Sequence, residues 1–229
     1  MPKLSKRLET IASLVPFGAR VCDIGTDHGY LSIELAKSGN AVRVISTDIN
    51  EKPLLRAKEN ISLAKVEGIE LRLCDGLAGI SSQEVDTVVI AGMGGEVISG
   101  ILERGADVAE NNDKTFILQP TTSPEFLRDF LCKKGYYIIS ETPIFENGKL
   151  YSIMHSKFYG EAKCYEPYFS YIGKIKPDSE EGRLYIAKQY KRCYNCQLAL
   201  ENIKEKQAEY NYYKSVAAKL QEILETVKE

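Results

Sequence analysis

Ten residues near the N-terminus, CDIGTDHGYL from Cys22 to Leu31, bring together groups that can do chemistry. They include two acids, Asp23 and Asp27, two glycines, and His28, one of only two histidines in the chain. A glycine directly after a strand lets the backbone approach a ligand without a Cβ in the way. The two acids favour a ligand that carries positive charge. The segment therefore predicts a binding site in which Gly25 lies against the ligand.

Four further segments end an apolar run with polar or glycine residues. They are Asp48 after 41–47, Cys74-Asp75-Gly76 after 69–73, Ala91-Gly92-Met93-Gly94-Gly95 after 85–90, and Gln119-Pro120 after 114–118. Ligands of open α/β sheets bind beyond the carboxyl ends of the strands, where the strand order reverses. We therefore expect all of these residues to meet at one edge of a sheet and to form one nucleoside site.

The spacing of the glycine turn separates two nucleoside ligands. A nicotinamide dinucleotide needs its pyrophosphate held by G-x-G-x-x-G at a helix N-terminus. Here the middle glycine is absent, and Asp27 would put a carboxylate where the anion should lie. S-adenosylmethionine instead carries an α-ammonium, which Asp23 can pair with, and a ribose, whose two hydroxyls Asp48 can bind. The residues favour S-adenosylmethionine as the cofactor.

Alternating strands and helices must position this site. We predict strands at 19–25, 41–48, 69–75, 85–92 and 114–120 and helices at 29–39, 50–68, 95–105 and 123–135. Asn147-Gly148 between two alternating runs predicts a hairpin over 136–158. This order predicts an α/β fold, a doubly wound Rossmann-like sheet of seven strands whose terminal hairpin adds an antiparallel strand at one edge.

Three residues should mark the ends of these helices. Asn50 is expected to cap the helix over 50–68, and Gly68 is expected to end it. Ser123 is expected to cap the helix over 123–135, with Pro124 at its first position.

The C-terminal part of the chain differs in composition. Residues 157–229 hold 13 Lys/Arg and 11 Asp/Glu, while 1–156 hold 17 and 21, and ten of the 14 tyrosines lie within 159–213. Apolar residues recur there every three or four positions, at Leu184, Ala187, Tyr190, Tyr194, Leu198, Val216, Leu220, Ile223 and Val227. This spacing predicts two antiparallel helices packed as a coiled coil, or one long helix. We divide the chain into a domain at 1–158 and a linker with a helical appendage at 159–229.

Composition restricts the class of protein. The chain has 229 residues, no apolar run long enough to span a bilayer, and no apolar signal-peptide core at its N-terminus. We expect a cytoplasmic monomer without membrane contact, with its six cysteines reduced. Cys193 and Cys196 form a C-x-x-C with no second pair of ligands nearby, so we expect no metal and interpret them as helix packing.

Four segments carry a resemblance to a known family. They are LSKRLETIASLVP at Leu4–Pro16, DIGTDHGYL at Asp23–Leu31, VVIAGMGG at Val88–Gly95 and ILQP at Ile117–Pro120. Through them the chain resembles the class I S-adenosylmethionine-dependent methyltransferases, and more narrowly the bacterial tRNA (adenine-22-N1)-methyltransferases. The resemblance covers essentially the whole chain, although the appendage matches only in character. It implies methyl transfer from S-adenosyl-L-methionine to adenine N1 in tRNA, with S-adenosylhomocysteine as product.

The resemblance and the residue chemistry together assign roles around the cofactor. The methionine part falls to Asp23, Gly25 and Thr26, the ribose to Asp48, the adenine to Ile49, Asp75 and Gly76, and the point of transfer to Ala91, Gly92, Met93 and Gly94. Asp48 and Asp75 have an alternative role as helix caps. Arg7, in the opening helix, either reaches over the cofactor pocket or a phosphate, or forms a surface ion pair.

The expected reaction needs little acid–base chemistry. Adenine N1 already carries a lone pair, so catalysis should come mainly from positioning. The methylated base becomes cationic, and Asp27 is our candidate for stabilising it, with His28 second. His28 can equally orient the turn, and Gln119 either binds the base edge or ties two loops together. Some adenine N1-methyltransferases have an aspartate after the fourth strand, where this chain has Met93.

Four basic residues of the appendage are candidates for contacts with tRNA phosphates, namely Arg183, Lys188, Lys191 and Arg192, while nearby tyrosines could stack on bases. A plain solvated helical surface is the alternative. Two other functions stay open, a non-catalytic RNA-binding protein on a methyltransferase scaffold and a small-molecule methyltransferase. The intact acids argue against the first, and the basic, tyrosine-rich appendage argues against the second.

Overall fold

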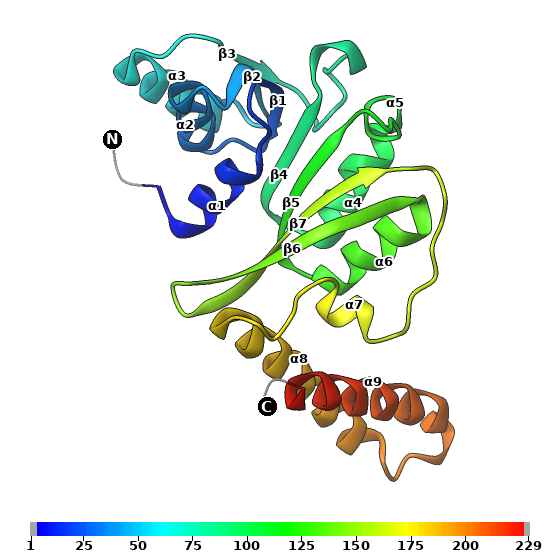
Figure 1. The fold of residues 1–229 in the computed structure, drawn as a ribbon. Helices are drawn as coiled ribbons and strands as arrows, with labels where there is room; N and C mark the ends of the chain where they lie inside the picture. The colour runs from blue at the N-terminus through cyan, green and yellow to red at the C-terminus, as the bar shows by residue number, and fades with distance from the viewer. Residues whose placement is uncertain (1–3, 227–229) are drawn as a thin grey trace.

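A seven-stranded sheet forms the centre of the molecule, in a computed structural model that describes residues 4–226 (Figure 1). The strand order is β3-β2-β1-β4-β5-β7-β6. The strands are β1 Ala19–Ile24, β2 Ala41–Asp48, β3 Ile69–Leu73, β4 Thr87–Gly94, β5 Thr115–Thr122, β6 Tyr136–Glu146 and β7 Lys149–Phe158. The first five are parallel, and β7 runs antiparallel between β5 and β6. The predicted sheet and terminal hairpin are confirmed, with β6 as the outermost strand.

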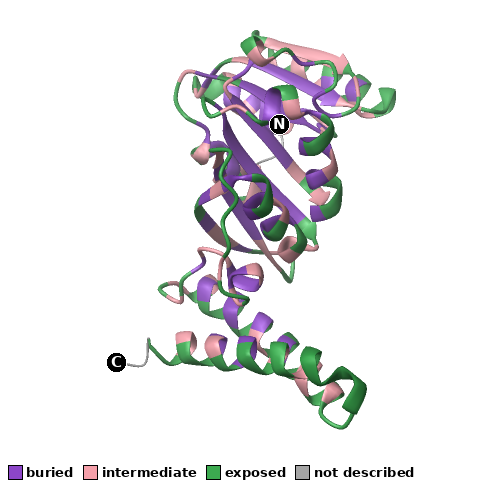
Figure 2. Cartoon of the chain, turned by 90° about the vertical axis from the view of Figure 1, so that its right-hand side faces the viewer, coloured by how far each residue is buried: buried purple, intermediate pink, exposed green. Residues whose placement is uncertain are grey.

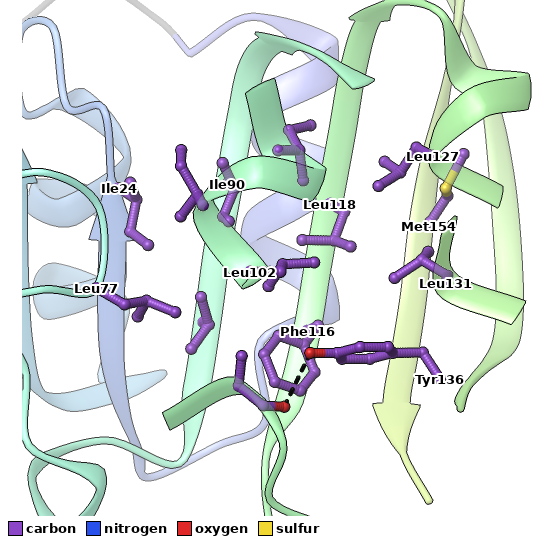
Figure 3. Close-up of a cluster of buried hydrophobic side chains, with 14 of the residues drawn as sticks. Ile24, Leu77, Ile90, Leu102, Phe116, Leu118, Leu127, Leu131, Tyr136 and Met154 are labelled. Carbon is purple, nitrogen blue, oxygen red and sulfur yellow. Dashed lines mark hydrogen bonds between the residues drawn. The ribbon is translucent and has the colours of Figure 1, made fainter. Parts of the chain in front are cut away.

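Helices cover both faces of this sheet. One face carries α1 Lys6–Leu14, α2 Tyr30–Ser38 and α3 Glu51–Ala64, and the other carries α4 Gly95–Arg104, α5 Ala106–Ala109 and α6 Pro124–Lys134. Because side chains alternate along a strand, Val89 of β4 packs toward α1 and α2, while Val88 and Ile90 pack toward α4. The second face holds the larger apolar cluster, in which the Tyr136 hydroxyl donates to the carbonyl of Ala109 at 3.1 Å (Figure 3).

The helical appendage consists of α7 Phe169–Ile172, α8 Glu180–Leu200 and α9 Gln207–Glu225. A turn at 201–206, with a 3₁₀ segment at Lys204–Lys206, folds α9 back along α8, so the two-helix prediction is confirmed and the single long helix is wrong (Figure 1). The predicted apolar spacing is correct for Val216 and Leu220 of α9, which are buried. Val227 lies outside the described residues.

On α8 the predicted buried face is wrong by about one residue. Leu184, Tyr194 and Leu198 are 45%, 40% and 47% exposed, and the buried side chains are instead Tyr185, Ile186, Gln189 and Cys193. The reason is that α8 packs against α7 and the sheet hairpin as well as α9, so its buried face is not a simple two-helix seam. Figure 2 shows the outcome, with buried positions along the inner sides of both helices and exposed ones at their far end.

A buried ion pair joins the appendage to the sheet domain. Arg128 of α6 and Glu141 of β6 have fully buried side chains and lie 2.8 Å apart. The Arg128 guanidinium also donates to the carbonyls of Ser170 and Tyr171, both at 2.9 Å, and to the hydroxyl of Tyr185 at 3.1 Å. Since these partners belong to α7 and α8, the Arg128 side chain connects the sheet domain to two helices of the appendage at once.

Several predicted helix ends differ from the structure. Helix α3 ends at Ala64, where Lys65 takes the left-handed conformation and donates its N–H to the carbonyl of Ser62. Gly68 therefore does not end the helix as predicted, and its carbonyl accepts the N–H of Val44 in β2. Asn50 and Ser123 occupy the N-cap positions of α3 and α6, but neither side chain forms a capping hydrogen bond. The short helices α5 and α7 have no counterpart in the prediction.

Two further observations concern the cysteines and the helices of the described chain. The six cysteines are all free thiols, and Cys193 is buried within the packing of the appendage. Over residues 4–226, the structure contains no helix with the length and apolar character needed to cross a membrane.

Candidate active site

A cavity of about 330 Å³ opens at the carboxyl ends of β1 and β4. Its walls are Arg7 and Leu8 of α1, Asp23 of β1, the turn from Gly25 to Gly29, Tyr30 and Leu31 of α2, and Ala91 and Gly92 of β4. The first and fourth predicted strand ends therefore meet in one place, together with the opening helix. Leu8, Gly29, Tyr30 and Leu31 were not among the predicted site residues.

Asp23 is the buried charge of this cavity. Its carboxylate is 5% exposed and accepts a hydrogen bond from the Ser32 hydroxyl at 2.6 Å, which in turn lies 2.7 Å from the Ser46 hydroxyl. Burial raises the pKa of the Asp23 carboxyl, and hydrogen bonds from Ser32 and Thr26 offset part of that rise. No cationic side chain within residues 4–226 forms an ion pair with Asp23. A buried carboxylate in this state is suited to a cationic ligand.

The turn after β1 requires glycine. Gly25 has φ +80°, and a Cβ at this position would overlap the terminal methyl of Met93. Gly29 has φ +70°, and a Cβ there would lie 3.2 Å from the Cβ of Ala57 in α3. The turn therefore brings bare backbone against the cavity on one side and against α3 on the other.

Asp27 and His28 lie at the mouth of the cavity. The Asp27 carboxylate is 67% exposed, with one oxygen 3.2 Å from Nε2 of His28 and the other 3.7 Å from Arg56 of α3. The His28 ring stacks on Tyr30, and its carbonyl accepts a hydrogen bond from Asn60. Both carboxylate oxygens of Asp27 thus already face neighbouring donors.

Arg7 enters the cavity from α1 and is held by two distant strands. Its backbone N–H and its Nε donate to the Glu146 carboxylate at 3.0 and 3.4 Å, and its Nη1 donates to the Gln119 side-chain oxygen. The same oxygen accepts the N–H of Gly92 at 3.1 Å, while the Gln119 amide nitrogen donates to the Pro120 carbonyl at 2.8 Å. Gln119 is fully buried, so its amide ties the ends of β4 and β5 together.

Asp48 ends β2 and Ile49 follows it, and both lie outside the walls of this cavity. One Asp48 carboxylate oxygen accepts the N–H of Asn50 at 2.7 Å. Because Asn50 is itself the N-cap residue of α3, this contact closes the turn before the helix and does not cap its first-turn N–H groups. Ile49 is 66% exposed and free to cover a flat apolar ligand.

The end of β3 and the last residues of β4 lie on the same rim. Asp75 accepts a hydrogen bond from Arg104 of α4 at 3.1 Å, in an exposed ion pair. Gly76 has φ +59°, and a Cβ there would lie 2.7 Å from a side-chain methyl of Ile101. Gly94 pairs with Thr122 across the sheet, beside Met93.

The sequence matches the Methyltransferase domain family over residues 4–154. The chain belongs to this methyltransferase family. It is 39% identical over 153 residues to the tRNA (adenine(22)-N(1))-methyltransferase of Bacillus subtilis (strain 168), an alignment that covers 66% of this chain and 64% of that protein. The aligned region thus spans just under two thirds of that relative's length.

Solved structures extend the likeness of this methyltransferase over nearly the whole chain. The B. subtilis tRNA methyltransferase TrmK is 27% identical with a TM-score of 0.84, covering 97% of this chain and 99% of that one. The Streptococcus pneumoniae protein Sp1610, in complex with S-adenosyl-L-methionine, is 31% identical with a TM-score of 0.77, covering 94% and 100%. The family resemblance seen in the sequence is confirmed, and the appendage is part of it.

The four basic residues proposed for RNA contact differ in their surroundings on the methyltransferase. Arg192 forms an ion pair with Glu125 of α6 at 2.6 Å, and Arg183 donates to a carbonyl of the loop before α8. Lys188 lines a second cavity together with Arg192, whereas Lys191 is exposed outside it. In the described part of the chain, no group of three His, Cys, Asp or Glu side chains is placed to hold a metal ion.

Proposed function

We propose that this methyltransferase transfers the methyl group of S-adenosyl-L-methionine to N1 of an adenine in tRNA, with position 22 as the expected target. The observation that carries the proposal is Asp23, a buried carboxylate without a cationic partner in residues 4–226, beside a turn that only glycine fits. The named activity of the B. subtilis relative and the ligand of the S. pneumoniae structure support the same reaction and cofactor.

The residues present fit the cofactor. Asp23 would pair with the α-ammonium, and Ser32 would hold its carboxylate in place through the 2.6 Å hydrogen bond. The bare backbone at Gly25 and Thr26 would lie along the methionine tail. Asp48 would accept from the ribose hydroxyls with its second oxygen, since only one is engaged by Asn50.

The adenine of the cofactor would lie near the ends of β2 and β3. Ile49 would pack on its face, and Asp75 with Gly76 would border its edge. Ala91, Gly92, Met93 and Gly94 would line the point of transfer at the end of β4.

The bound cofactor supplies an electrophilic methyl group on its sulfonium. Because adenine N1 already carries a lone pair, no residue has to remove a proton before transfer. The protein then contributes mainly by positioning, which supplies about 7–11 kcal/mol in favourable cases. The link from Arg7 through Gln119 to Gly92 would keep the end of β4 rigid for this purpose.

Asp27 is our candidate for stabilising the cationic methylated base. Its carboxylate is exposed at the mouth of the cavity, next to His28. The positive base would compete with Arg56 and His28 for the two carboxylate oxygens. Asp27 would therefore act by exchanging one cationic partner for another.

We assign catalysis to residues 1–158 and tRNA binding to the appendage at 159–229. We further propose that the protein is a cytoplasmic monomer.

The test of the proposed reaction incubates the full chain with S-adenosyl-L-methionine and tRNA, followed by mass spectrometry of the released nucleosides. We expect N1-methyladenosine from a tRNA with adenine at position 22 and none from the same tRNA with guanine there. Cofactor binding without any methylated nucleoside would indicate a non-catalytic RNA-binding protein instead.

A further inference from the structure

A second cavity, of about 340 Å³, lies between the start of α6, the β6–β7 hairpin and α8. We call it the α6–α8 cleft and define it by Thr122, Ser123, Ser152, Lys188, Gln189 and Arg192. Its walls come from both parts of the molecule, since Lys188, Gln189 and Arg192 belong to the appendage and the other three to the sheet domain. The docking of α8 beside the hairpin, visible in Figure 1, creates it.

Two sets of contacts connect this cleft to the cofactor cavity, although the two share no lining residue. Thr122 pairs with Gly94 across β4 and β5, and the neighbouring Thr121 hydroxyl donates to the carbonyl of Met93 at 3.0 Å. On the other side, the Arg7 guanidinium lines the cofactor cavity and lies 5.7 Å above the ring of Tyr151, which lines the cleft. Through these contacts the cleft lies next to the end of β4, where the target base would be placed for transfer.

The groups in the cleft are suited to an anion. The Gln189 residue is only 6% exposed and lines the cleft. Its side-chain amide forms no hydrogen bond within residues 4–226 and is not enclosed by protein, so a ligand in the cleft can reach it. The Ser123 hydroxyl caps no N–H of α6, and this helix start adds a partial positive charge. The unpartnered amide of Gln189 is an observation independent of the helix end, and both line the same cavity.

The charge balance of the cleft depends on Lys188. Arg192 is neutralised by Glu125, which also lines the cleft, at 2.6 Å. Lys188 forms no ion pair with any described residue, so it supplies the net positive charge. Its ammonium and the Gln189 amide offer donors from adjacent positions of α8.

We propose that the α6–α8 cleft binds a backbone phosphodiester of the tRNA, adjacent to the target adenine, through Lys188, Gln189 and the hydroxyls of Thr122 and Ser123. This inference rests on the proposed function, because the cleft is useful only next to a methyl-accepting nucleotide. It distinguishes Lys188 from the other basic residues of the appendage.

The first test compares two alanine variants of the full chain. Lys188→Ala removes the unpaired charge of the cleft, and Lys133→Ala removes an exposed lysine at the far end of α6. We expect Lys188→Ala to raise the KM for tRNA about tenfold and to reduce the salt slope of tRNA binding by about one. The Kd for S-adenosyl-L-methionine should stay unchanged, and Lys133→Ala should match the parent. Equal tRNA kinetics for the two variants would overturn the proposal.

The second test locates the phosphate. Synthetic tRNAs carry one uncharged methylphosphonate, either next to the target adenine or ten nucleotides away, and each is assayed with parent and Lys188→Ala. With the adjacent methylphosphonate we expect Lys188→Ala to cause no further loss, whereas with the distant one the tenfold loss should persist, as a double-mutant cycle requires. Losses that simply add at the adjacent position would refute the site.

These outcomes are separable from failure of the proposed function. If the parent protein methylates no tRNA, the reaction itself is wrong. If the parent methylates tRNA and Lys188→Ala behaves as Lys133→Ala does, the reaction stands and only the proposal for the cleft is wrong.

Gln189→Leu, which keeps the volume of the side chain, should also raise the KM for tRNA. It should not lower the melting temperature, because no hydrogen bond within the described chain is lost.

Discussion

Replacing Arg128 with methionine should destabilise this protein more than any exposed charge substitution. The Arg128 side chain is fully buried, and within residues 4–226 its removal leaves the buried Glu141 carboxylate with only the N–H of Lys174, at 3.1 Å, and no cation. Breaking a buried ion pair from one side costs about 3–5 kcal/mol. The carbonyls of Ser170 and Tyr171 lose donors as well. For a chain of this size, that loss corresponds to a melting temperature about 6–20 °C lower.

Thermal and urea denaturation of three variants measures this cost. Arg128→Met is compared with the double variant Arg128→Met/Glu141→Leu, which leaves no uncompensated carboxylate and should recover at least half of the lost stability. Arg43→Met breaks the ion pair between Arg43 and Glu70, in which the two side chains are 42% and 43% exposed. This change should lower the free energy of unfolding by less than about 1 kcal/mol. An Arg128→Met variant as stable as Arg43→Met would show that the buried pair does not hold the appendage to the sheet.

Three further predictions concern the cofactor cavity and the strand ends beside it. Asp48→Ala should weaken S-adenosyl-L-methionine binding about 10- to 150-fold in titration calorimetry, the loss of a charge-assisted hydrogen bond, and unchanged affinity would remove it from the ribose role. Burial raises the pKa of the Asp23 carboxyl, so the folded protein holds the carboxyl proton to higher pH than the unfolded chain does. The free energy of unfolding should therefore fall as pH rises from about 4, the ordinary pKa of an aspartate, through the higher pKa of the folded state. Asp23→Asn should abolish that fall, and an unaltered stability–pH profile would contradict it. Asp27→Asn should bind cofactor normally but methylate tRNA more slowly in single turnovers, and a parental rate would leave catalysis to positioning alone.

The strand order and the cofactor rim were accessible from sequence because each depends on local patterns. Apolar runs ending in Asp-x-Gly or Asp-Gly identify strand ends, and parallel topology then brings them to one edge. The serines behind Asp23 carried a weaker signal, as Ser32 and Ser46 interrupt an apolar helix and an apolar strand. This signal indicated buried hydroxyls, but it did not predict which carboxylate they would hydrogen bond to.

Other features depend on contacts between distant segments. Arg128 and Glu141 look like ordinary surface charges in the sequence, and only the docking of α7 and α8 buries them. The same docking decides which face of α8 is covered, so periodicity alone favoured Leu184 where Tyr185 is buried. The partners of Gln119 likewise come from α1 and β4, which no local pattern connects.

The placement of β7 has a consequence for how the chain folds during synthesis. β5 pairs with β4 on one side, and its other side can pair only after β7 has been synthesised. Arg7 likewise gains its hydrogen bonds to Glu146 only after a further 139 residues. When only the first five strands of a nascent chain have left the ribosome, the outer edge of β5 is unpaired. In the folded protein this edge is covered by β7, and an exposed strand edge of this kind can pair with other chains. The opening helix gains its final anchor only when the hairpin has emerged. The wall of the cofactor cavity is thus completed by nearly the last part of the sheet domain to leave the ribosome, which ties cofactor binding to completion of that domain.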